Sequence, residues 1–381
     1  MKYSLSSLCE YRKGKVNVDG LNKDTYISTE NMLPNKGGVI RATSLPTTSQ
    51  TQEYKKGDVL VSNIRPYFKK IWQAEYDGGC SNDVLVFKAN ENTDKDFLYY
   101  VLADDAFFNY SMATSKGTKM PRGDKTSIMQ YGVPHYDIVE QKKIACVLRL
   151  LDKKIECNNK INNNLLDQAL TLYATYFAES DKNGFIGDYC TIKSGFAFKS
   201  SWWTENGVKV IKIGSINQDN LNLAECSYVD VDKIDKAKDF KVGAGDLLIA
   251  MTGATIGKFA MVPYCTETLL VNQRVGKFFL GDNPVEKLPF IYCTLKQPDV
   301  YYEIVNRGQG SAQPNISAAD IMSIPCVIPT ADVLNTFNDT VQPLFDLIIT
   351  NQQENQRLSE LRDTLLPKLI SGELDVSDIQ F

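Results

Sequence analysis

The chain has 381 residues and a formal net charge of −4, with 43% hydrophobic and 10% aromatic residues. This length predicts two or three domains, each large enough to bury its own core. The near-neutral charge does not favour the strongly basic surface of a nonspecific nucleic-acid binder, and no stretch of about 18 apolar residues is present to cross a membrane.

The N-terminal segment MKYSLSSLCEYRKGK has no apolar stretch of signal-peptide length. The nine cysteines of the chain lie far apart and form no CxxC pair. This pattern is typical of free thiols in a reducing compartment. We therefore expect a soluble cytoplasmic protein with no membrane partner.

Residues 1–135 carry strand and turn signals. Residues 58–61 (DVLV) follow Gly57, and residues 82–87 (NDVLVF) follow a Gly-Gly pair. Short apolar runs bounded by glycine turns are typical of β-strands. We expect a mixed α/β domain with a twisted sheet over residues 1–135.

Residues 136–180 change to a heptad pattern, in which apolar or Asn residues step alternately by four and by three. This spacing is typical of a coiled-coil helix. An alternative interpretation is a helical hairpin, with the Asn-rich run 158–164 as its turn. The seam of the heptad pattern consists of Ile144, Leu148, Leu151, Ile155, Asn158, Asn162, Leu165, Ala169 and Leu172.

Residues 181–328 return to strand and turn signals after the helix-ending run DKNG. Residues 208–213 (VKVIKI) and 245–250 (GDLLIA) have the composition of buried strands. The Gly-Asp corner at residue 245 resembles the one at residue 57, which lies 188 positions earlier. We expect a second mixed α/β domain here, with small loop insertions absorbing the change of offset.

Residues 329–381 repeat the helical pattern and carry three basic against nine acidic residues. Eight of the nine seam positions keep their apolar or Asn character after a shift of 193 residues, so we interpret the chain as a tandem duplication. Pro343 lies inside this second pattern and should kink the helix or mark the start of its regular part, so we expect a short helix before it and a long helix after it. The shifted positions are Phe337, Val341, Leu344, Ile348, Asn351, Asn355, Leu358, Arg362 and Leu365.

The consecutive Asn positions lie near the midpoint of each seam. Antiparallel pairing of the two helices brings the midpoints together, so Asn158, Asn162, Asn351 and Asn355 are expected to form one polar layer that fixes the register. The predicted fold class is α+β, with two mixed α/β domains separated by two long helices that pair as an antiparallel coiled coil in a pseudo-twofold repeat. The apolar candidates for helix pairing are Leu148, Leu151, Ile155, Leu344, Ile348 and Leu358.

Patterns that indicate catalysis are scarce. His135 is the single histidine, so a His triad or a multi-His metal site is excluded. Residues 253–259 (GATIGKF) resemble a phosphate-binding loop but have Phe where Ser or Thr would bind magnesium. We predict no catalytic residue, no metal site and no cofactor bound by this chain, which favours a binding protein over an enzyme.

The loop at residues 62–70 (SNIRPYFKK) combines an amide, an aromatic pair and three cations. Arg and Asn can contact guanine and adenine edges, and Lys contacts phosphates. The alternative is a solvated strand edge protected by lysines. With two other basic loops, it supplies the DNA-binding candidates of the first domain: Lys36, Arg41, Asn63, Arg65, Tyr67, Lys69, Lys119 and Arg122.

The candidate loops of the second domain are richer in amides and hydroxyls, which suits the reading of base edges. Taken alone, a loop of this kind is more often an ordinary surface loop than a DNA contact. The candidates are Lys193, Lys212, Ser215, Thr252, Thr255, Gln273, Arg274, Gln313 and Asn315.

The segments GDVLVSNIRPYFKKIW, IGDYCTIKSGFAF, VKVIKIGSI, VPHYDIVEQKKIACVLRLLDKKI and LRDTLLPKLISGEL, with the repeated domain-helix plan, cover essentially the whole chain. In these features the sequence resembles the specificity subunit of type I restriction-modification systems. The resemblance implies a noncatalytic subunit with target recognition domains at 1–135 and 181–328 and conserved helical regions at 136–180 and 329–381.

The resemblance further implies that each recognition domain reads half of a bipartite site in double-stranded DNA, and that the helices set the gap. Two methyltransferase subunits would dock on the helical regions and bind S-adenosylmethionine, while restriction subunits would use ATP and Mg for translocation and cleavage. The family's usual Gln of the first helical region is Gln141, whereas the second has Asn335 near the matching position. The competing hypothesis is a coiled-coil interaction scaffold without DNA binding.

Overall fold

The computed structural model describes residues 2–309 and 314–377. The chain divides into two compact units, Met1–Lys154 with Leu358–Phe381 and Ile155–Arg357. Each unit holds one globular part and a segment of both long helices, α4 (Ile138–Phe177) and α9 (Ala331–Ser371). The boundaries of the compact units therefore differ from those of the four segments expected from the sequence, because each long helix contributes residues to both units.

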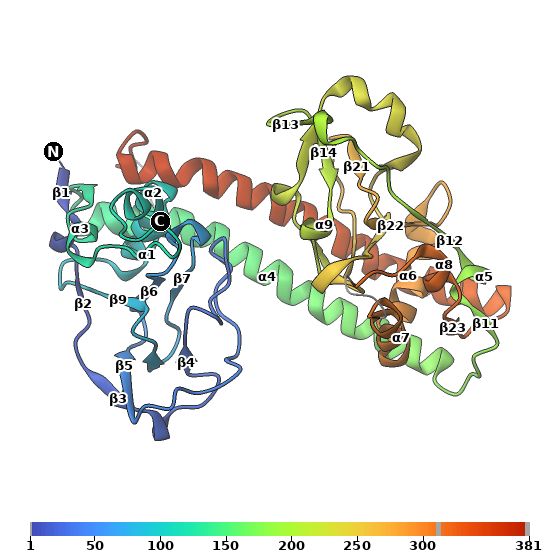
Figure 1. Cartoon of the computed structure of the whole chain (residues 1–381), viewed down its shortest axis with the longest axis horizontal. Coiled ribbons are helices and arrows are strands. Elements are labelled where there is room, and N and C mark those ends of the chain that lie inside the picture. The colour runs from blue at the N-terminus through green and yellow to red at the C-terminus, as the bar shows by residue number, and fades with distance from the viewer. Residues whose placement is uncertain (1, 310–313, 378–381) are drawn as a thin grey trace. The chain divides into compact units, whose positions relative to one another are not determined.

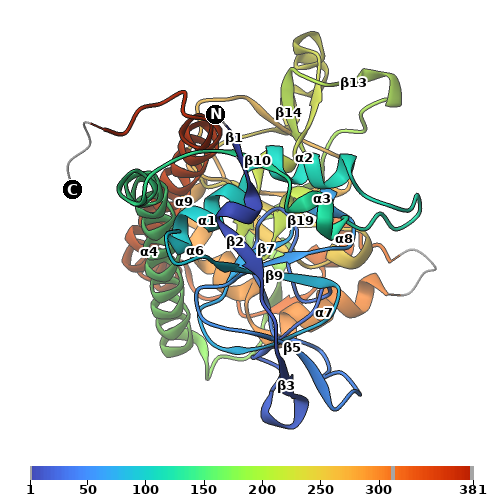
Figure 2. The same cartoon turned by 90° about the vertical axis from the view of Figure 1, so that its left-hand side faces the viewer.

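The first unit contains two four-stranded sheets, with the orders β2-β9-β6-β7 and β3-β5-β8-β4. A short pair, β1 (Lys2–Ser4) with β10 (Gly132–Pro134), joins the two ends of this globular part, as Figure 2 shows. The strands of the two sheets are β2 (Cys9–Tyr11), β3 (Lys15–Asn17), β4 (Tyr26–Ile27), β5 (Gln50–Tyr54), β6 (Val59–Ser62), β7 (Ile71–Gln73), β8 (Gly78–Cys80) and β9 (Val84–Ala89).

Three helices of the first unit, α1 (Lys95–Ala103), α2 (Asp105–Ala113) and α3 (Lys125–Ile128), lie beside the sheet that contains β6 and β9 (Figure 1). Apolar residues of α1 and α2 are buried with the inner faces of β6 and β9 in one core. Each helix starts at an Asp whose carboxylate accepts backbone N–H bonds of the first turn, which explains where the helices begin.

Gln141 at the start of α4 is buried and accepts a hydrogen bond of 2.9 Å from the backbone N–H of Asp94, just before α1. Its Nε2 also donates to the backbone oxygen of Tyr136 over 3.0 Å. In the second helix, Asn335 is exposed, whereas Asn338 is buried and accepts from the N–H of Phe290 over 3.0 Å. The amide that joins each long helix to its globular part is therefore at a different position in the two repeats.

The second unit contains a four-stranded sheet of order β12-β22-β19-β20 and a five-stranded sheet of order β13-β17-β14-β21-β18. Its strands are β11 (Gly184–Phe185), β12 (Thr191–Ser194), β13 (Trp203–Thr204), β14 (Val208–Ile211), β15 (Ile216–Asn217), β16 (Asn220–Leu221), β17 (Ser227–Val229), β18 (Lys241–Val242), β19 (Leu247–Ala250), β20 (Phe259–Met261), β21 (Leu269–Val271), β22 (Val275–Phe279) and β23 (Pro325–Cys326).

The helices of the second unit are α5 (Ile186–Tyr189), α6 (Pro284–Leu295), α7 (Pro298–Gly308) and α8 (Ala318–Met322). Apolar residues of α6 and α7 share a core with β19, β22 and both long helices of this unit. The aromatic rings of Phe177 on α4 and Phe337 on α9 lie 5.2 Å apart within that core.

Backbone pairing supports the duplication inferred from the sequence. Tyr3 pairs with Val133 between β1 and β10, and Gly184 pairs with Cys326 between β11 and β23, so the partners are related by 181 and 193 residues. The Gly-Asp corners also correspond, because Gly57 has φ +90° and Gly245 has φ +80°. Changes of offset fall in the segments between these elements.

The predicted antiparallel helix pairing is confirmed within each unit. In the first unit, Arg362 of α9 bonds Asp152 of α4 over 2.8 Å. In the second unit, Asn158 donates to Asn355 over 2.9 Å and Asn351 donates to Asn162 over 2.8 Å. Residue numbers rise on one helix as they fall on the other, and amides meet in the polar layer together with Glu354 and Asn159.

The apolar positions of the seam differ in burial. Leu148 and Ile348 are fully buried in the cores of their units. The other pairing candidates are half-buried: Leu151, Ile155, Leu344 and Leu358.

Two expectations about the helices are wrong. The hairpin alternative at 158–164 fails because α4 continues through these residues, with Asn158 buried against α9. The break expected at Pro343 is also absent, since α9 runs from Ala331 to Ser371. A proline removes one hydrogen bond from the helical ladder, and Val341 and Phe345 on either side are fully buried, so core packing holds the helix together.

Candidate nucleic-acid interface

The loop between β6 and β7, residues 63–70, has an unusual backbone. Arg65 (φ +51°) and Lys69 (φ +50°) are both left-handed and flank a 3-10 turn at Pro66–Phe68. The Arg65 N–H donates to the backbone oxygen of Pro121 over 2.8 Å, and Ile64 pairs with Arg122. The β6–β7 loop is thereby attached to a second basic loop.

A third segment closes around the β6–β7 loop. The N–H groups of Asn35 and Lys36 donate to the oxygens of Phe68 and Lys69 over 2.8 and 2.9 Å. Asn35 and Lys36 are also left-handed, so four of the five such non-glycine residues in the described chain belong to this cluster. Left-handed conformations of large residues cost about 1–2 kcal/mol each and gather at functional sites.

Acidic residues partly neutralise this cluster. Asp105 at the start of α2 accepts from Lys69 over 2.7 Å and from Lys36 over 2.9 Å. Burial acts to raise the pKa of Asp105, but hydrogen bonds from Lys69 and Lys36 outweigh it and hold that pKa below its ordinary value. Arg122 pairs with Asp83 over 3.2 Å. These pairs are half-exposed, so a more strongly charged ligand can exchange with the carboxylates.

Two buried polar atoms in the β6–β7 loop, Asn63 Oδ1 and Arg65 Nε, have no hydrogen-bond partner within residues 2–309 and 314–377. Buried polar groups are normally paired, so an unpaired one requires a specific reason. Tyr67 and Phe68 are 48% and 37% exposed beside them, with ring centroids 4.6 Å apart. The loop therefore presents aromatic and cationic surface in a conformation that folding alone does not favour.

The loop between β19 and β20, residues 251–258, follows the same path. Gly253 N–H donates to the oxygen of Pro314 over 2.9 Å, and Thr252 pairs with Asn315. Gly253 (φ +71°) and Gly257 (φ +82°) occupy the left-handed positions, 188 residues after Arg65 and Lys69. Thr252 Oγ1 is also buried without a partner among the described residues.

The structure brings most of the candidates of the first unit together. Arg41 is exposed on another segment, where it lies 3.3 Å from Asp24. Lys119 is exposed within the turn of the 116–122 hairpin. The candidates gathered around the β6–β7 loop are Lys36, Asn63, Arg65, Tyr67, Lys69 and Arg122.

The candidates of the second unit are more dispersed. Thr252, Thr255 and Asn315 lie at the β19–β20 loop. Gln273 and Arg274 are exposed on the turn before β22, and the Arg274 backbone oxygen accepts from Met251 over 3.0 Å.

Lys193 and Lys212 lie elsewhere in the second unit. Lys193 is exposed on β12, with Nζ 5.1 Å from the Phe279 ring centroid. Lys212 Nζ lies 3.6 Å from the Trp203 ring centroid, and burial lowers the pKa of its ammonium group. Gln313 falls outside the described residues.

Two candidates require correction. Ser215 is fully buried, and its Oγ lies 3.7 Å from Cys226 Sγ, because the turn after β14 packs this hydroxyl into the core. Asn63 is only 9% exposed, since its side chain is covered by Gly123. In the loop conformations of this structure, the expectation that either residue presents its side chain to a base edge is wrong.

The second unit also contains an aromatic cluster that is not among the residues predicted from the sequence. The Phe196 ring stacks on Trp202 with centroids 6.0 Å apart and planes at 13°. The ammonium groups of Lys199, Lys233 and Lys236 lie 5.7, 5.6 and 5.1 Å from the Trp202 centroid. Aromatic faces among cations suit stacking and phosphate contacts. The adjacent tryptophans in the sequence were the available signal.

The described residues were also compared with the requirements of a metal site, a reactive thiol and a membrane-spanning helix. No group of three or more His, Cys, Asp or Glu side chains there lies close enough to hold a metal ion. All nine cysteines are free thiols, and burial raises the pKa of Cys80 and Cys293 to about 12. Within residues 2–309 and 314–377, no helix is both long and apolar enough to span a membrane.

Comparison with known proteins gives one consistent family. The sequence pattern of the type I restriction modification DNA specificity domain matches residues 1–167 and 180–361. The MjaVIII type I restriction enzyme specificity subunit of Methanocaldococcus jannaschii is 24% identical over 323 residues, which cover 79% of this chain and 75% of that protein. The HindI specificity subunit of Haemophilus influenzae is 23% identical over 465 aligned residues, which cover 98% of this chain and 99% of that protein.

A solved structure of the S subunit of a type I restriction-modification system from M. genitalium also aligns with this chain. The TM-score is 0.51 at 18% identity, with coverage of 97% of this chain and 96% of the other. At this level of identity, the likeness establishes the fold alone.

Proposed function

Because the chain belongs to the family of type I restriction-modification DNA specificity subunits, we propose that it is a noncatalytic subunit that recognises a bipartite, gapped target in double-stranded DNA. The first globular part, within residues 1–135, reads one half-site, and the second, within residues 181–328, reads the other. The β6–β7 and β19–β20 loops each contact their half-site.

The observation that carries this proposal is the shared construction of the two loops. Both loops contain buried polar atoms that lack a partner in the part of the chain that the structure describes, and both use two left-handed residues to turn. A DNA duplex offers phosphate and base-edge acceptors as well as donors, which can satisfy such groups when the loop opens onto it. A scaffold without a nucleic-acid ligand has no corresponding reason to retain these features twice.

The two half-sites differ in sequence, so the target is asymmetric. Arg65, Tyr67 and Lys69 of the first loop correspond to Gly253, Thr255 and Gly257 of the second. A guanidinium can contact guanine in a bidentate manner, whereas a threonine offers a hydroxyl and a methyl group. Identical half-sites would require similar side chains at these equivalent positions.

Two methyltransferase subunits dock on the helical regions in this proposal, and restriction/translocase subunits complete the assembly. S-adenosylmethionine, ATP and Mg are bound by those partners. Large apolar side chains support a docking role, since Val139 and Leu150 of α4 are 58% and 53% exposed and Leu361 of α9 is 46% exposed. Isolated exposed apolar residues are ordinary, but several along paired helices favour a protein partner.

A methylation map tests the proposal directly. The chain is expressed with its neighbouring methyltransferase subunit, and methylated adenine is mapped across the genome against the methyltransferase alone. A new gapped, asymmetric motif that depends on the chain is expected. A stable complex that yields no motif would contradict DNA recognition and favour the scaffold function.

Variants assign each half of the motif. Arg65→Ala is expected to relax or abolish one half, and Thr255→Ala is expected to alter the other half alone. Lys23→Ala removes an exposed lysine that is not among the proposed DNA contacts and serves as the matched control. Equal damage from all three substitutions would contradict the assignment of the loops.

A further inference from the structure

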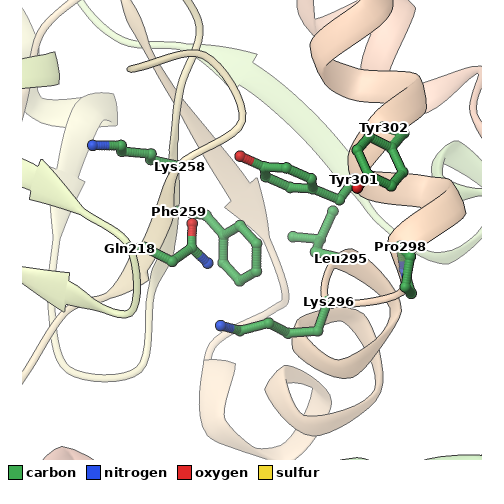
Figure 3. Close-up of a pocket in the computed structure, with 8 residues that line it drawn as sticks. All are labelled: Gln218, Lys258, Phe259, Leu295, Lys296, Pro298, Tyr301 and Tyr302. Carbon is green, nitrogen blue, oxygen red and sulfur yellow. The ribbon is translucent and has the colours of Figure 1, made fainter. Parts of the chain in front are cut away.

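A cavity of about 370 Å³ opens on the second unit between the β15–β16 turn, the start of β20 and helices α6 and α7. Its size falls within the roughly 300–1,000 Å³ of small-molecule sites. Figure 3 shows Phe259 at the centre of the lining, with Gln218 on one side, Leu295 on the other and Lys296 extending along its ring.

The floor of the cavity is apolar. Phe259 and Leu295 are fully buried, and Tyr301 forms a wall against Gly257, where an added Cβ would lie 3.4 Å from the tyrosine ring. Tyr302 is 63% exposed at the rim. Aromatic rings around an apolar cavity floor favour a flat, unsaturated ligand, which stacks on such rings.

The ammonium groups of Lys258 and Lys296 lie beside this cavity floor. Lys296 contacts Asp219, which also accepts from the buried Tyr292 hydroxyl, and Lys296 Nζ lies 5.6 Å from the Phe259 ring centroid. No ion pair joins Lys258 to another residue of the described ranges. With Asp219 matching one lysine, the cavity keeps an excess of one positive charge.

The Gln218 side chain supplies a polar edge. Its carboxamide has both a donor and an acceptor and lies on the exposed β15–β16 turn, where its Nε2 is 3.4 Å from Asp219 Oδ1. A neutral hydrocarbon would leave the charge of Lys258 without a counterpart and would place an apolar group against the Gln218 carboxamide. A simple anion such as phosphate would leave the aromatic surface unused.

We propose that this cavity binds a nucleotide, with the nucleobase stacked on Tyr301 above the buried Phe259 and Leu295, and the phosphate held by Lys258 and Lys296. The Gln218 amide meets the edge of the base. The nucleotide is either a free mononucleotide or an unstacked nucleotide of a DNA strand, because both sources present the same base and phosphate.

The position of Lys258 gives the site a consequence for the rest of the second unit. Lys258 is the last residue of the β19–β20 loop, and its backbone N–H donates to Thr255 within that loop over 3.0 Å. A phosphate held by Lys258 therefore rests on the same loop that is proposed to contact a half-site. Occupancy of the cavity does not require the chain to recognise duplex DNA.

Calorimetric titration of the full chain with AMP tests this site, with adenosine and inorganic phosphate as separate titrations. AMP is expected to bind saturably and more tightly than either fragment. Lys258→Ala and Tyr301→Leu are each expected to weaken AMP binding about tenfold, because one charge-assisted contact or one stacked ring is lost. Lys287→Ala, which removes an exposed lysine of α6, serves as the matched control.

A short single-stranded oligonucleotide replaces AMP in a parallel titration. Binding of the oligonucleotide but not AMP, with loss in the same two variants, assigns the site to a nucleotide of a strand. Binding of AMP alone assigns it to a free nucleotide. Absence of saturable binding in both titrations, or equal affinities for wild type, Lys258→Ala and Tyr301→Leu with circular dichroism unchanged, overturns the proposal.

Failure at this cavity is separable from failure of DNA recognition. The methylation motif depends on the β6–β7 and β19–β20 loops, whereas AMP binding is measured on the isolated chain without a methyltransferase. If the chain binds AMP but gives no methylation motif, the nucleotide site stands and the proposed function is contradicted. If the chain gives a motif but does not bind AMP, the proposed function stands and the nucleotide site is contradicted.

Discussion

The two globular parts differ most where their equivalent loops turn. Arg65 and Lys69 take left-handed conformations in the first loop, and Gly253 and Gly257 take them in the second. Glycine adopts this conformation without steric penalty, whereas Arg and Lys do not. The same backbone path is therefore kept in both, but only the first loop has large cations at its left-handed positions, at a cost in stability.

The Gly-Asp corners beneath the loops also keep the same backbone turn while the side chains that contact them differ. Asp58 is held by Arg12, with a hydrogen bond of 2.9 Å from Nη2, and the equivalent Asp246 is held by Lys277 over 2.8 Å. Arg12 follows β2, whereas Lys277 lies on β22, yet each acid also accepts a backbone N–H of its own turn. Duplicated units can thus exchange their cations while the turns that position the loops stay fixed.

The helix pair gives the largest expected contrast. Asp152 and Arg362 in the first unit occupy the positions of Phe345 and Ala169 in the second at the repeat offset of 193 residues. Asp152 also accepts from the Tyr100 hydroxyl over 2.6 Å. Hydrogen bonds and charge from Asp152 raise the pKa of Arg362 despite burial, so the arginine remains charged.

Arg362→Ala is expected to lower the free energy of unfolding by roughly 2–3 kcal/mol, because it leaves the mostly buried Asp152 without its cation. Chemical denaturation of the full chain measures the change. The triple variant Asp152→Phe, Arg362→Ala and Tyr100→Phe copies the apolar arrangement of the second unit and removes the hydroxyl that would lose its acceptor. It is expected to recover most of the loss, and a triple variant as unstable as Arg362→Ala would contradict the equivalence of the two positions.

Arg65→Gly sharpens the comparison of the loops. It gives the first loop the residue found in the second, so stability is expected to stay level or rise by up to about 1 kcal/mol through relief of the left-handed strain. Affinity for the DNA target, measured with the methyltransferase complex, is expected to fall about tenfold, because one good arginine contact to a base is worth about 1–3 kcal/mol.

Arg65→Ala is the matched control for the glycine variant, because it removes the same guanidinium and retains the strain. Both variants should lose the same affinity, and only the glycine variant should gain stability. If Arg65→Ala kept full affinity, the guanidinium would have no role in recognition, and the strained conformation would need another explanation.

The sequence was sufficient to predict the duplication, the long helices and their antiparallel pairing, because heptad spacing and the Asn positions depend only on local periodicity. It could not separate Ser215 and Asn63 from exposed loop residues, since burial depends on how distant segments pack. The Trp202 cluster was missed for the same reason: its lysines come from residues 199, 233 and 236, which only the fold brings to one ring.

Pro343 is a case in which a strong local signal in the sequence predicted the structure wrongly. Its local effect on a helix is strong, but fully buried neighbours hold the helix through it. The cavity around Phe259 could not be predicted either, because its lining comes from three separate segments of the second unit. The sequence gives the chemical type of each side chain, whereas only the fold shows which side chains from distant segments lie together.

Gly253→Ala tests whether the second loop needs its glycines. An added Cβ at Gly253 meets nothing within 4 Å, so the expected cost is the left-handed strain alone, about 1 kcal/mol. Gly257→Ala adds a close approach of 3.2 Å to Val305 and is expected to cost more. Chemical denaturation ranks the two variants, and equal or reversed costs would contradict the backbone conformation assigned to this loop.

The smallest expected effect concerns the carboxylate that holds two cations of the first loop. The pKa of Asp105 lies below its ordinary value of 3.8, so its contribution to stability is complete at higher pH and is lost as the pH falls through the lower folded value. Asp105→Asn is expected to cost about 0.5 kcal/mol at pH 6, a small amount because the pair is half-exposed and screened. Thermal unfolding of both proteins between pH 6 and about pH 3 should show this difference shrinking with acid. A difference that stays constant over that range would mean that the charge of Asp105 does not hold Lys36 and Lys69, and the second loop, which has no lysines at these positions, should show no comparable acid dependence.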